Sequence, residues 1–164
     1  MSTIDDLGRL TLRPIGDDHP RPHSSSPYED WGQMADEARS VKHRRWLVEL
    51  TTGTGEVLPV GDLSAHEVWH GPTPGSRCMN IGISIAEEFR GQGVGGVAQA
   101  LLAASLHSEG FVRVEASTDV TNVAEQRALV KAGFAYEGTL RSAQARRDGR
   151  HDLQLWSHVS GIDS

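Results

Sequence analysis

The sequence predicts an α/β (α+β) fold, with residues 1–164 forming one domain. Strand-like and helix-like segments alternate in the second half of the chain, which indicates a sheet with a parallel crossover. A glycine-rich turn connects one of these strands to the helix that follows it, and Asp148-Gly149 predicts a hairpin between the last two strands. The sequence contains no internal repeat and no sign of a second domain.

The N-terminal part begins with a strand and a loop. Residues 9–15 alternate apolar and polar side chains, as expected of a half-buried strand. Residues 16–27 are rich in proline and serine and predict a loop, whereas residues 28–43 place apolar side chains at helical spacing. We therefore expect a helix over 28–43.

A hairpin is predicted next. Residues 45–50 and 56–62 fit two strands joined by a glycine-threonine turn. The segment 63–70 fits a strand or a short helix, and a proline-glycine turn ends it.

The C-terminal half supplies the crossover. We expect strands over residues 79–85 and 111–116, separated by a helix that Gly110 ends. Asn122 or Thr121 caps a second helix, which reaches Ala132. The last two strands, 134–146 and 150–159, flank the Asp148-Gly149 turn.

Charge and composition exclude several classes of protein. With 16 basic and 22 acidic residues the net charge is −6, which disfavours a nucleic-acid partner. The single cysteine, Cys78, excludes an internal disulfide and a cysteine-based zinc site. The N-terminus does not resemble a signal peptide, and the longest apolar stretch, 94–106, is too short to span a membrane. We therefore expect a cytoplasmic protein without a membrane partner.

The most informative segment is the turn over residues 90–96, Arg-Gly-Gln-Gly-Val-Gly-Gly. Glycines permit a tight turn and close approach of a ligand, and the first amides of the following helix are unpaired. Together with the helix dipole they favour an anion such as a pyrophosphate, to which Arg90 adds a cation. No Gly-Lys-Ser/Thr follows, which excludes a Walker loop. Gly91, Gly93 and Gly96 match a dinucleotide-binding pattern, but this pattern belongs at the first strand of its fold.

These residues resemble the acetyl-CoA-binding core of the GNAT N-acetyltransferase superfamily, whose motif is matched by Arg90, Gly93 and Gly95. The chain is most similar to the branch of ribosomal-protein serine/alanine N-terminal acetyltransferases. The resemblance extends from Leu10 to about Ser157. The matching segments are Leu10-Thr-Leu-Arg-Pro14, Ile81-Gly82, Asn122, Lys131-Ala-Gly-Phe134, Glu137-Gly138, Arg141 and Asp152.

The resemblance implies a mixed, mostly antiparallel sheet with helices on both faces. Its central parallel strands, 79–85 and 111–118, would splay apart and hold acetyl-CoA as cosubstrate, with no metal. The pantetheine would pair with one strand, the pyrophosphate would lie on the glycine turn, and an asparagine would contact the pantetheine. The cofactor-binding residues expected from this resemblance are Ile83, Ile85, Arg90, Gly91, Gln92, Gly93, Val94, Gly95, Gly96 and Asn122.

The resemblance also implies direct acetyl transfer to a primary amine, on a protein N-terminus or a small molecule. The family's usual proton donors, a serine and a tyrosine, correspond to Glu125 and Leu129, so both are replaced. Glu125 remains a candidate base or ligand of the substrate amine, and we name it as the candidate catalytic residue. Tyr136 is an alternative donor. The position of a carboxylate that acts as base in this branch corresponds to Gln144.

Two other functions are open. Because the usual donors are missing, the chain could bind CoA with weak or no catalysis. Residues 66–70, His-Glu-Val-Trp-His, match the spacing of a zinc metalloprotease, which requires a helix because a strand separates the two histidines by about 13 Å. A homodimer is also left open.

Overall fold

The computed structural model describes residues 7–21 and 26–161 and contains one seven-stranded sheet in the order β1-β2-β3-β4-β5-β7-β6. All neighbouring strands are antiparallel except β4 and β5, which confirms the predicted fold class. The strands are β1 Gly8–Ile15, β2 Arg44–Thr52, β3 Val57–Trp69, β4 Arg77–Ile85, β5 Arg113–Asp119, β6 Ala135–Arg146 and β7 Gly149–Val159. The helices are η1 Pro27–Glu29, α2 Asp36–Arg39, η2 Pro74–Ser76, η3 Glu87–Phe89, α3 Val94–Ser108 and α4 Val123–Lys131.

The central parallel pair separates after a short contact. β4 and β5 are in register only from Met79↔Val114 to Ile81↔Ala116. Beyond this point β4 stays paired with β3 as far as Ile85, and β5 stays paired with β7 as far as Asp119. The two strands therefore present unpaired backbone to each other, as the family resemblance predicts for strands 79–85 and 111–118.

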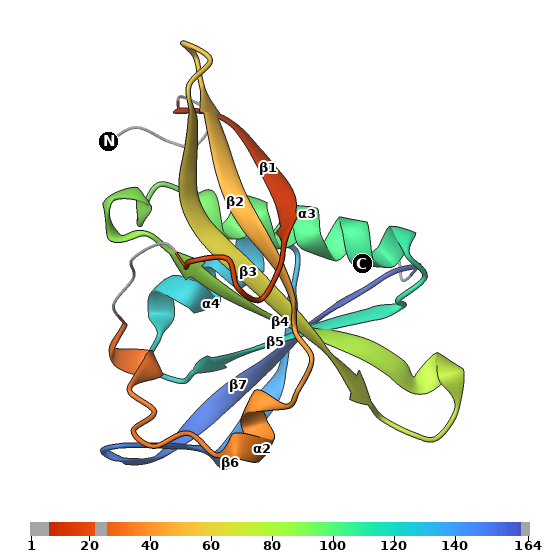
Figure 1. Ribbon diagram of the computed structural model, residues 1–164. Coiled ribbons are helices and arrows are strands. Elements are labelled where there is room, and N and C mark those ends of the chain that lie inside the picture. Colours follow the sequence, from red (N-terminus) through yellow and green to blue (C-terminus); the bar gives the residue numbers. More distant parts are fainter. Residues whose placement is uncertain (1–6, 22–25, 162–164) are drawn as a thin grey trace.

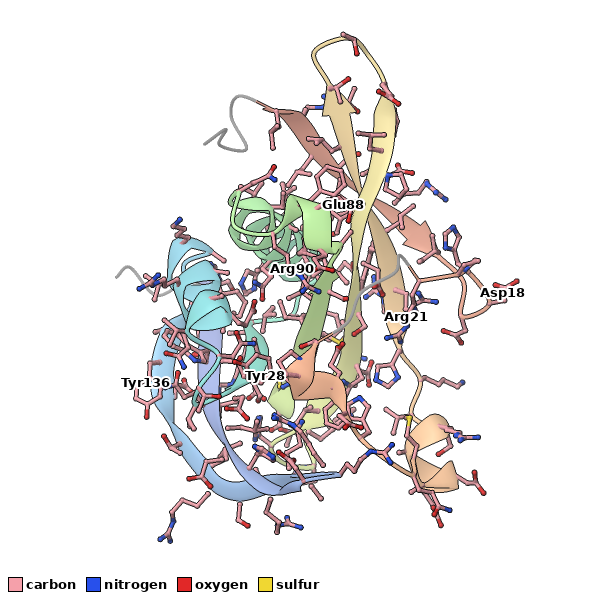
Figure 2. All side chains as sticks on the ribbon, turned by 90° about the vertical axis from the view of Figure 1, so that its left-hand side faces the viewer. Asp18, Arg21, Tyr28, Glu88, Arg90 and Tyr136 are labelled. Atoms are coloured by element: carbon pink, nitrogen blue, oxygen red, sulfur yellow. The ribbon has the colours of Figure 1, made fainter. Side chains whose placement is uncertain are left out.

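Helices lie on both sides of this sheet, but the four-residue α2 has no buried residue. Both views place α3 and α4 on one side and α2 on the other (Figures 1 and 2). The core lies under α3, where Ala98, Leu102 and Leu106 are fully buried against β-strand residues such as Leu63 and Val114. Small side chains on α3 let this helix lie close to the sheet and to α4.

The prediction of a helix over residues 28–43 is wrong. Only η1 and the single-turn α2 form there. Trp31 and Met34, which should have marked a buried face, are 39% and 48% exposed. Gly32 has a φ of +71°, which an α-helix does not accommodate. Helical spacing alone is insufficient here because no surface buries the apolar residues.

The ambiguous segment 63–70 is part of a long strand. β3 pairs with β4 without interruption from Gly61↔Ile85 to Trp69↔Arg77, so tertiary pairing decides the conformation. The His-Glu-x-x-His residues therefore do not form the helix that a zinc protease requires. At a spacing of about 13 Å on a strand, His66 and His70 cannot share one metal ion, and the metalloprotease hypothesis is wrong.

No helix among the described residues is both long enough and apolar enough to cross a membrane.

Candidate functional site

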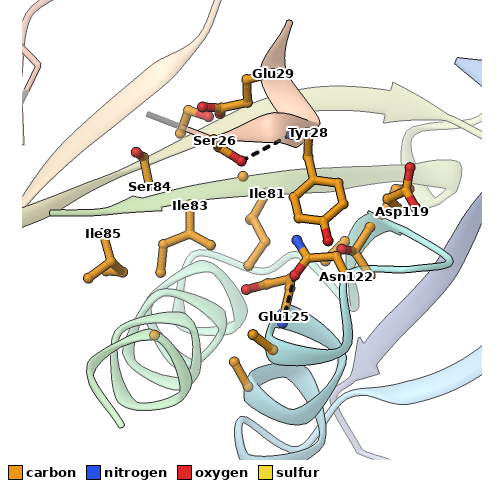
Figure 3. Close-up of a pocket in the computed structure, with 18 of the residues that line it drawn as sticks. Ser26, Tyr28, Glu29, Ile81, Ile83, Ser84, Ile85, Asp119, Asn122 and Glu125 are labelled. Carbon is orange, nitrogen blue, oxygen red and sulfur yellow. Dashed lines mark hydrogen bonds between the residues drawn. The ribbon is translucent and has the colours of Figure 1, made fainter. Parts of the chain in front are cut away.

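A cleft of about 920 Å³ opens where β4 and β5 separate. The unpaired half of β4 forms one wall, and the glycine turn and the N-terminal end of α4 form another. Figure 3 shows Ile81, Ile83 and Ile85 along β4, with Asn122 and Glu125 on α4. The segment around η1 also lines the cleft, through Ser26, Pro27, Tyr28, Glu29 and Trp31. The splayed strands, the turn and α4 thus meet at one site.

The glycine turn has the backbone that its sequence predicts. Gly91 and Gly93 have φ values of +72° and +90°, which side chains other than glycine rarely adopt. Gly93 is the N-cap of α3 and supplies no capping side chain, so the helix begins at Val94 with its first amides facing away from the helix. This arrangement suits an anion, because unpaired amides and the positive end of the dipole coincide.

Two polar side chains of this segment hold its backbone. Arg90 Nε donates to the carbonyl oxygen of Ile85 at 3.0 Å, and Gln92 Nε2 donates to the carbonyl oxygen of Glu88 at 2.9 Å. Arg90 thereby connects the turn to the end of β4. It was predicted only as a phosphate donor, and its contact with the strand is an additional role.

Gly95 and Gly96 differ in their surroundings. A Cβ on Gly95 would lie 3.7 Å from Ala128 Cβ and 4.0 Å from Ile83 Cδ1, which is ordinary contact. A Cβ on Gly96 would lie 3.2 Å from Lys131 Cβ and 3.3 Å from the Ala128 carbonyl oxygen. A side chain at Gly96 would therefore press on α4, whereas one at Gly95 would not.

Gly96→Ala is expected to be less stable than Gly95→Ala by about 1 kcal/mol or more, because both gain the same helix propensity but only the methyl group at Gly96 presses on α4. For a chain of this size, thermal unfolding monitored by circular dichroism should show a Tm a few degrees lower for Gly96→Ala than for Gly95→Ala. Gly95→Ala is the matched control, because its methyl group fits. Equal Tm values for the two variants would contradict the packing role of Gly96.

The N-terminus of α4 carries the two predicted polar residues. Asn122 is its N-cap, and its Oδ1 accepts from the Glu125 N–H at 3.2 Å. Capping uses only the oxygen, so the side-chain NH₂ group keeps its hydrogens for a ligand. Glu125 lines the cleft and is half-buried. Burial raises the pKa of Glu125 to about 7, and a hydrogen bond with Gln99 opposes this shift.

This shift predicts a pH-dependent stability. Below about pH 4.5 the Glu125 carboxyl is protonated in the folded and unfolded chain, and above about pH 7 the folded protein holds an ionised, half-buried carboxylate. Glu125→Gln should therefore raise the free energy of unfolding at pH 8 by on the order of 1–2 kcal/mol, less than the full shift because the site is partly solvated. Urea unfolding should show no such gain at pH 4. A gain that is independent of pH would contradict the assignment.

Other candidates from the sequence lie outside the reacting region. Leu129 is fully buried in the core, and the Tyr136 ring is half exposed on the outer side of β6 (Figure 2). The Tyr136 hydroxyl contacts Thr139. Gln144 lines the cleft, but its Oε1 accepts two hydrogen bonds from Arg146. Neither Leu129 nor Tyr136 can reach a ligand in the cleft.

Cys78 is buried. Burial, followed by the negative charge of Glu115, raises the pKa of its thiol to about 11. This result agrees with the absence of an activating base in the sequence around it and argues against a covalent acyl intermediate on this residue.

Sequence reasoning missed Tyr28. This residue extends from η1 into the cleft, and its ring points toward Asn122 and Glu125 (Figure 3). Its hydroxyl donates to the Thr121 carbonyl oxygen over a long 3.4 Å. The hairpin carries Arg146 beneath the ring, at 5.7 Å from the ring centre. Nothing in the sequence indicates that a residue 94 positions before Asn122 lies next to it.

A buried ion pair forms the floor of the cleft. Asp119, the last residue of β5, accepts from the backbone and side chain of Thr121 and pairs with Arg146 Nη1 at 2.8 Å. Burial would raise the pKa of Asp119, but the donors from Thr121 and Arg146 hold it below its usual value. His151 contacts both Asp119 and Asp148, so it belongs to this network. The pair links β5 to the final hairpin.

Two histidines line the cleft near β3. His66 on β3 and His43 before β2 both line the cleft, with ring centroids 5.2 Å apart. Burial, and then the adjacent His43, lower the pKa of His66, which favours its neutral form. The neutral imidazole of His66 can therefore accept a proton at this side of the cleft.

A mostly antiparallel sheet that opens between two parallel strands, with a glycine turn and a helix N-terminus beside the opening, is the architecture of a GNAT acetyltransferase domain. The family model for the acetyltransferase (GNAT) domain matches residues 9–135. The chain therefore belongs to the GNAT acetyltransferase family.

Solved structures support the same fold. An acetyltransferase of the GNAT family from Bacillus anthracis is 19% identical, with a TM-score of 0.56 over 70% of this chain and 65% of that protein. A ribosomal-protein-alanine N-acetyltransferase from Brucella melitensis is 21% identical, with a TM-score of 0.57 over 71% of this chain and 68% of that protein. RimJ from Mycobacterium smegmatis, solved with CoA-disulfide, is 26% identical, with a TM-score of 0.60 over 76% of this chain and 56% of that protein.

The chain thus spans about two thirds or less of the length of several similar structures. No curated protein sequence matches it significantly.

Proposed function

We propose that this protein transfers an acetyl group from acetyl-CoA directly to a primary amine, on a protein N-terminus or a small molecule. One observation carries the proposal: in a GNAT chain, the cleft between β4 and β5 opens directly beside the N-terminus of α3. A cofactor with a pyrophosphate and an amide-containing arm matches these two features. The pyrophosphate lies on the amides of residues 91–96, and the arm pairs with residues 82–85 like an added strand.

In the transfer step, the neutral amine nitrogen attacks the thioester carbon, and the carbon–sulfur bond breaks. An amide of the unpaired β4 edge stabilises the developing oxyanion. Glu125 accepts the proton of the amine, since a base with a pKa of about 7 is half ionised at neutral pH. Asn122 donates its NH₂ hydrogens to the pantetheine arm.

The CoA thiolate still requires a proton, and α4 offers no hydroxyl at the family's usual positions. We assign this role to Tyr28, whose hydroxyl lies over the N-terminus of α4 and is held only by a long hydrogen bond. This group replaces the missing serine and tyrosine from a different part of the chain. A thiolate is a good leaving group, so Tyr28 accelerates the step without being indispensable.

Tyr28→Phe is expected to reduce kcat by about 10- to 100-fold, because the ring stays in place and only the proton donor is lost. The KM for acetyl-CoA should change little. Tyr136→Phe is the matched control, since its hydroxyl lies outside the cleft, and its kcat should equal that of the wild type. Unchanged turnover in Tyr28→Phe would exclude Tyr28 as the donor.

The direct test is an assay of free CoA release with acetyl-CoA and a panel of amines. The panel includes peptides with N-terminal serine or alanine, because the similar structures include a ribosomal-protein-alanine N-acetyltransferase, and small primary amines. We expect turnover of at least one acceptor with formation of its N-acetyl product by mass spectrometry. Failure of the protein to bind acetyl-CoA would overturn the proposal.

The second candidate is a CoA-binding protein with weak or no catalysis. The replacement of the usual donors by Glu125 and the buried Leu129 favours it. Binding of acetyl-CoA without release of CoA across the amine panel would select this alternative.

A further inference from the structure

Three side chains that can ligate a metal meet on the face of the sheet opposite α3. Cys78 lies on β4 and Glu115 on β5, and His70 directly follows β3. Their neighbours Met79 and Val114 belong to the core under α3. Because side chains alternate between the faces of a strand, Cys78 and Glu115 point to the other side. None of the three residues lines the cleft, so this cluster has no part in the proposed reaction.

The three ligating atoms are close enough for one ion. The His70 nitrogen, the Cys78 sulfur and a Glu115 oxygen all lie within 4.8 Å of one another. His70 Nε2 is 2.6 Å from Glu115 Oε1, and the nearby Glu115 carboxylate contributes to the raised pKa of the Cys78 thiol. In a tetrahedral zinc site, ligand–metal distances of about 2.0–2.3 Å separate neighbouring ligand atoms by roughly 3–4 Å. A metal ion can take the place of the proton between His70 and Glu115 and of the proton on the Cys78 thiol.

The charges around the cluster suit a divalent cation. Arg113 Nε donates to Glu115 Oε1 at 2.6 Å, and its Nη1 donates to Glu137 at 2.8 Å. Arg113 is thus shared between two carboxylates. With Cys78 as thiolate, the three anionic groups and one guanidinium leave two negative charges to neutralise. A bound metal ion deprotonates a coordinating thiol outright, so the free thiol does not prevent binding.

Access and ligand type point to zinc. The His70 side chain is 53% exposed, while that of Glu115 is 4% exposed, so an ion can enter from the His70 side and keep a water ligand there. One sulfur, one nitrogen and one oxygen ligand suit Zn²⁺ better than Mg²⁺ or Ca²⁺, which prefer oxygen. We propose that His70, Cys78 and Glu115 bind one zinc ion. The single cysteine excludes a site built from several cysteines, but not this mixed site.

The test is a titration of metal-free protein with Co²⁺, which reports a thiolate ligand through a charge-transfer band in the near ultraviolet. We expect one equivalent of Co²⁺ to produce the band and Zn²⁺ to abolish it by displacement. His70→Ala should weaken Co²⁺ binding by more than about tenfold, and Cys78→Ser should remove the band. His66→Ala is the matched control from the same five-residue motif and should titrate like the wild type.

His70→Ala keeps the test decisive if Cys78→Ser does not fold, because the His70 side chain is half exposed and its loss leaves the core intact. Circular dichroism verifies the fold of each variant. Absence of the band in the wild type, or a band of unchanged affinity in His70→Ala, would overturn the zinc site. Neither result depends on acetyl transfer, so the proposed function is tested separately.

Discussion

Glu125→Gln is expected to lower kcat for acetyl transfer by about 100-fold or more, since the amide keeps the shape of the side chain and cannot accept the amine proton. The wild-type pH–rate profile should rise with an apparent pKa of about 7, and the variant should lose this limb. The Kd for acetyl-CoA should stay nearly unchanged, because the proposed role of this carboxylate is toward the acceptor amine and not toward the cofactor. Steady-state kinetics from roughly pH 5.5 to 9 measures kcat and the position of the pH limb for the wild type and the variant.

Glu29→Gln provides the matched control, because Glu29 is another glutamate at the cleft that is exposed and lies outside α4. Its kinetics should follow the wild type. A Glu125→Gln enzyme that retains the wild-type kcat and pH limb would show that another group takes the proton, and His66 at the opposite rim would then be the next candidate.

Gly95→Asp is expected to weaken acetyl-CoA binding by about 100-fold or more, because a carboxylate at the first turn of α3 repels the pyrophosphate. The space at this position accommodates a Cβ, so the effect reports charge rather than misfolding. Gly95→Asn has nearly the same size without the charge, and its Kd should stay within about tenfold of the wild type. Isothermal titration calorimetry gives the three values. Equal Kd values for the Asp and Asn variants would contradict an anion site at this turn.

Local patterns predicted most of the fold. Alternating side chains located the strands, and Gly110, Asn122 and Gly149 marked helix ends and the final hairpin. The errors arise where tertiary contacts decide. Residues 28–43 have helical spacing but no surface to cover, and 63–70 become a strand because β4 pairs with them.

In the candidate site, too, local features could be predicted from the sequence and tertiary contacts could not. The glycine turn, Asn122 and Glu125 are local features, and the structure brings them to one cleft. Tyr28 and the Asp119–Arg146 pair could not be predicted, because each depends on contacts between distant parts of the chain. The role of Gly96 was also hidden, since only the distance between α3 and α4 shows that it serves packing.

Amide-resolved hydrogen exchange with and without acetyl-CoA tests the cofactor site most directly. Bound cofactor should slow exchange in two segments that are separate in sequence, residues 82–85 on the unpaired edge of β4 and residues 91–96 at the turn. CoA should protect the same amides, because it carries the same pyrophosphate and pantetheine. Unchanged exchange at both of these segments would contradict a cofactor site between β4 and β5.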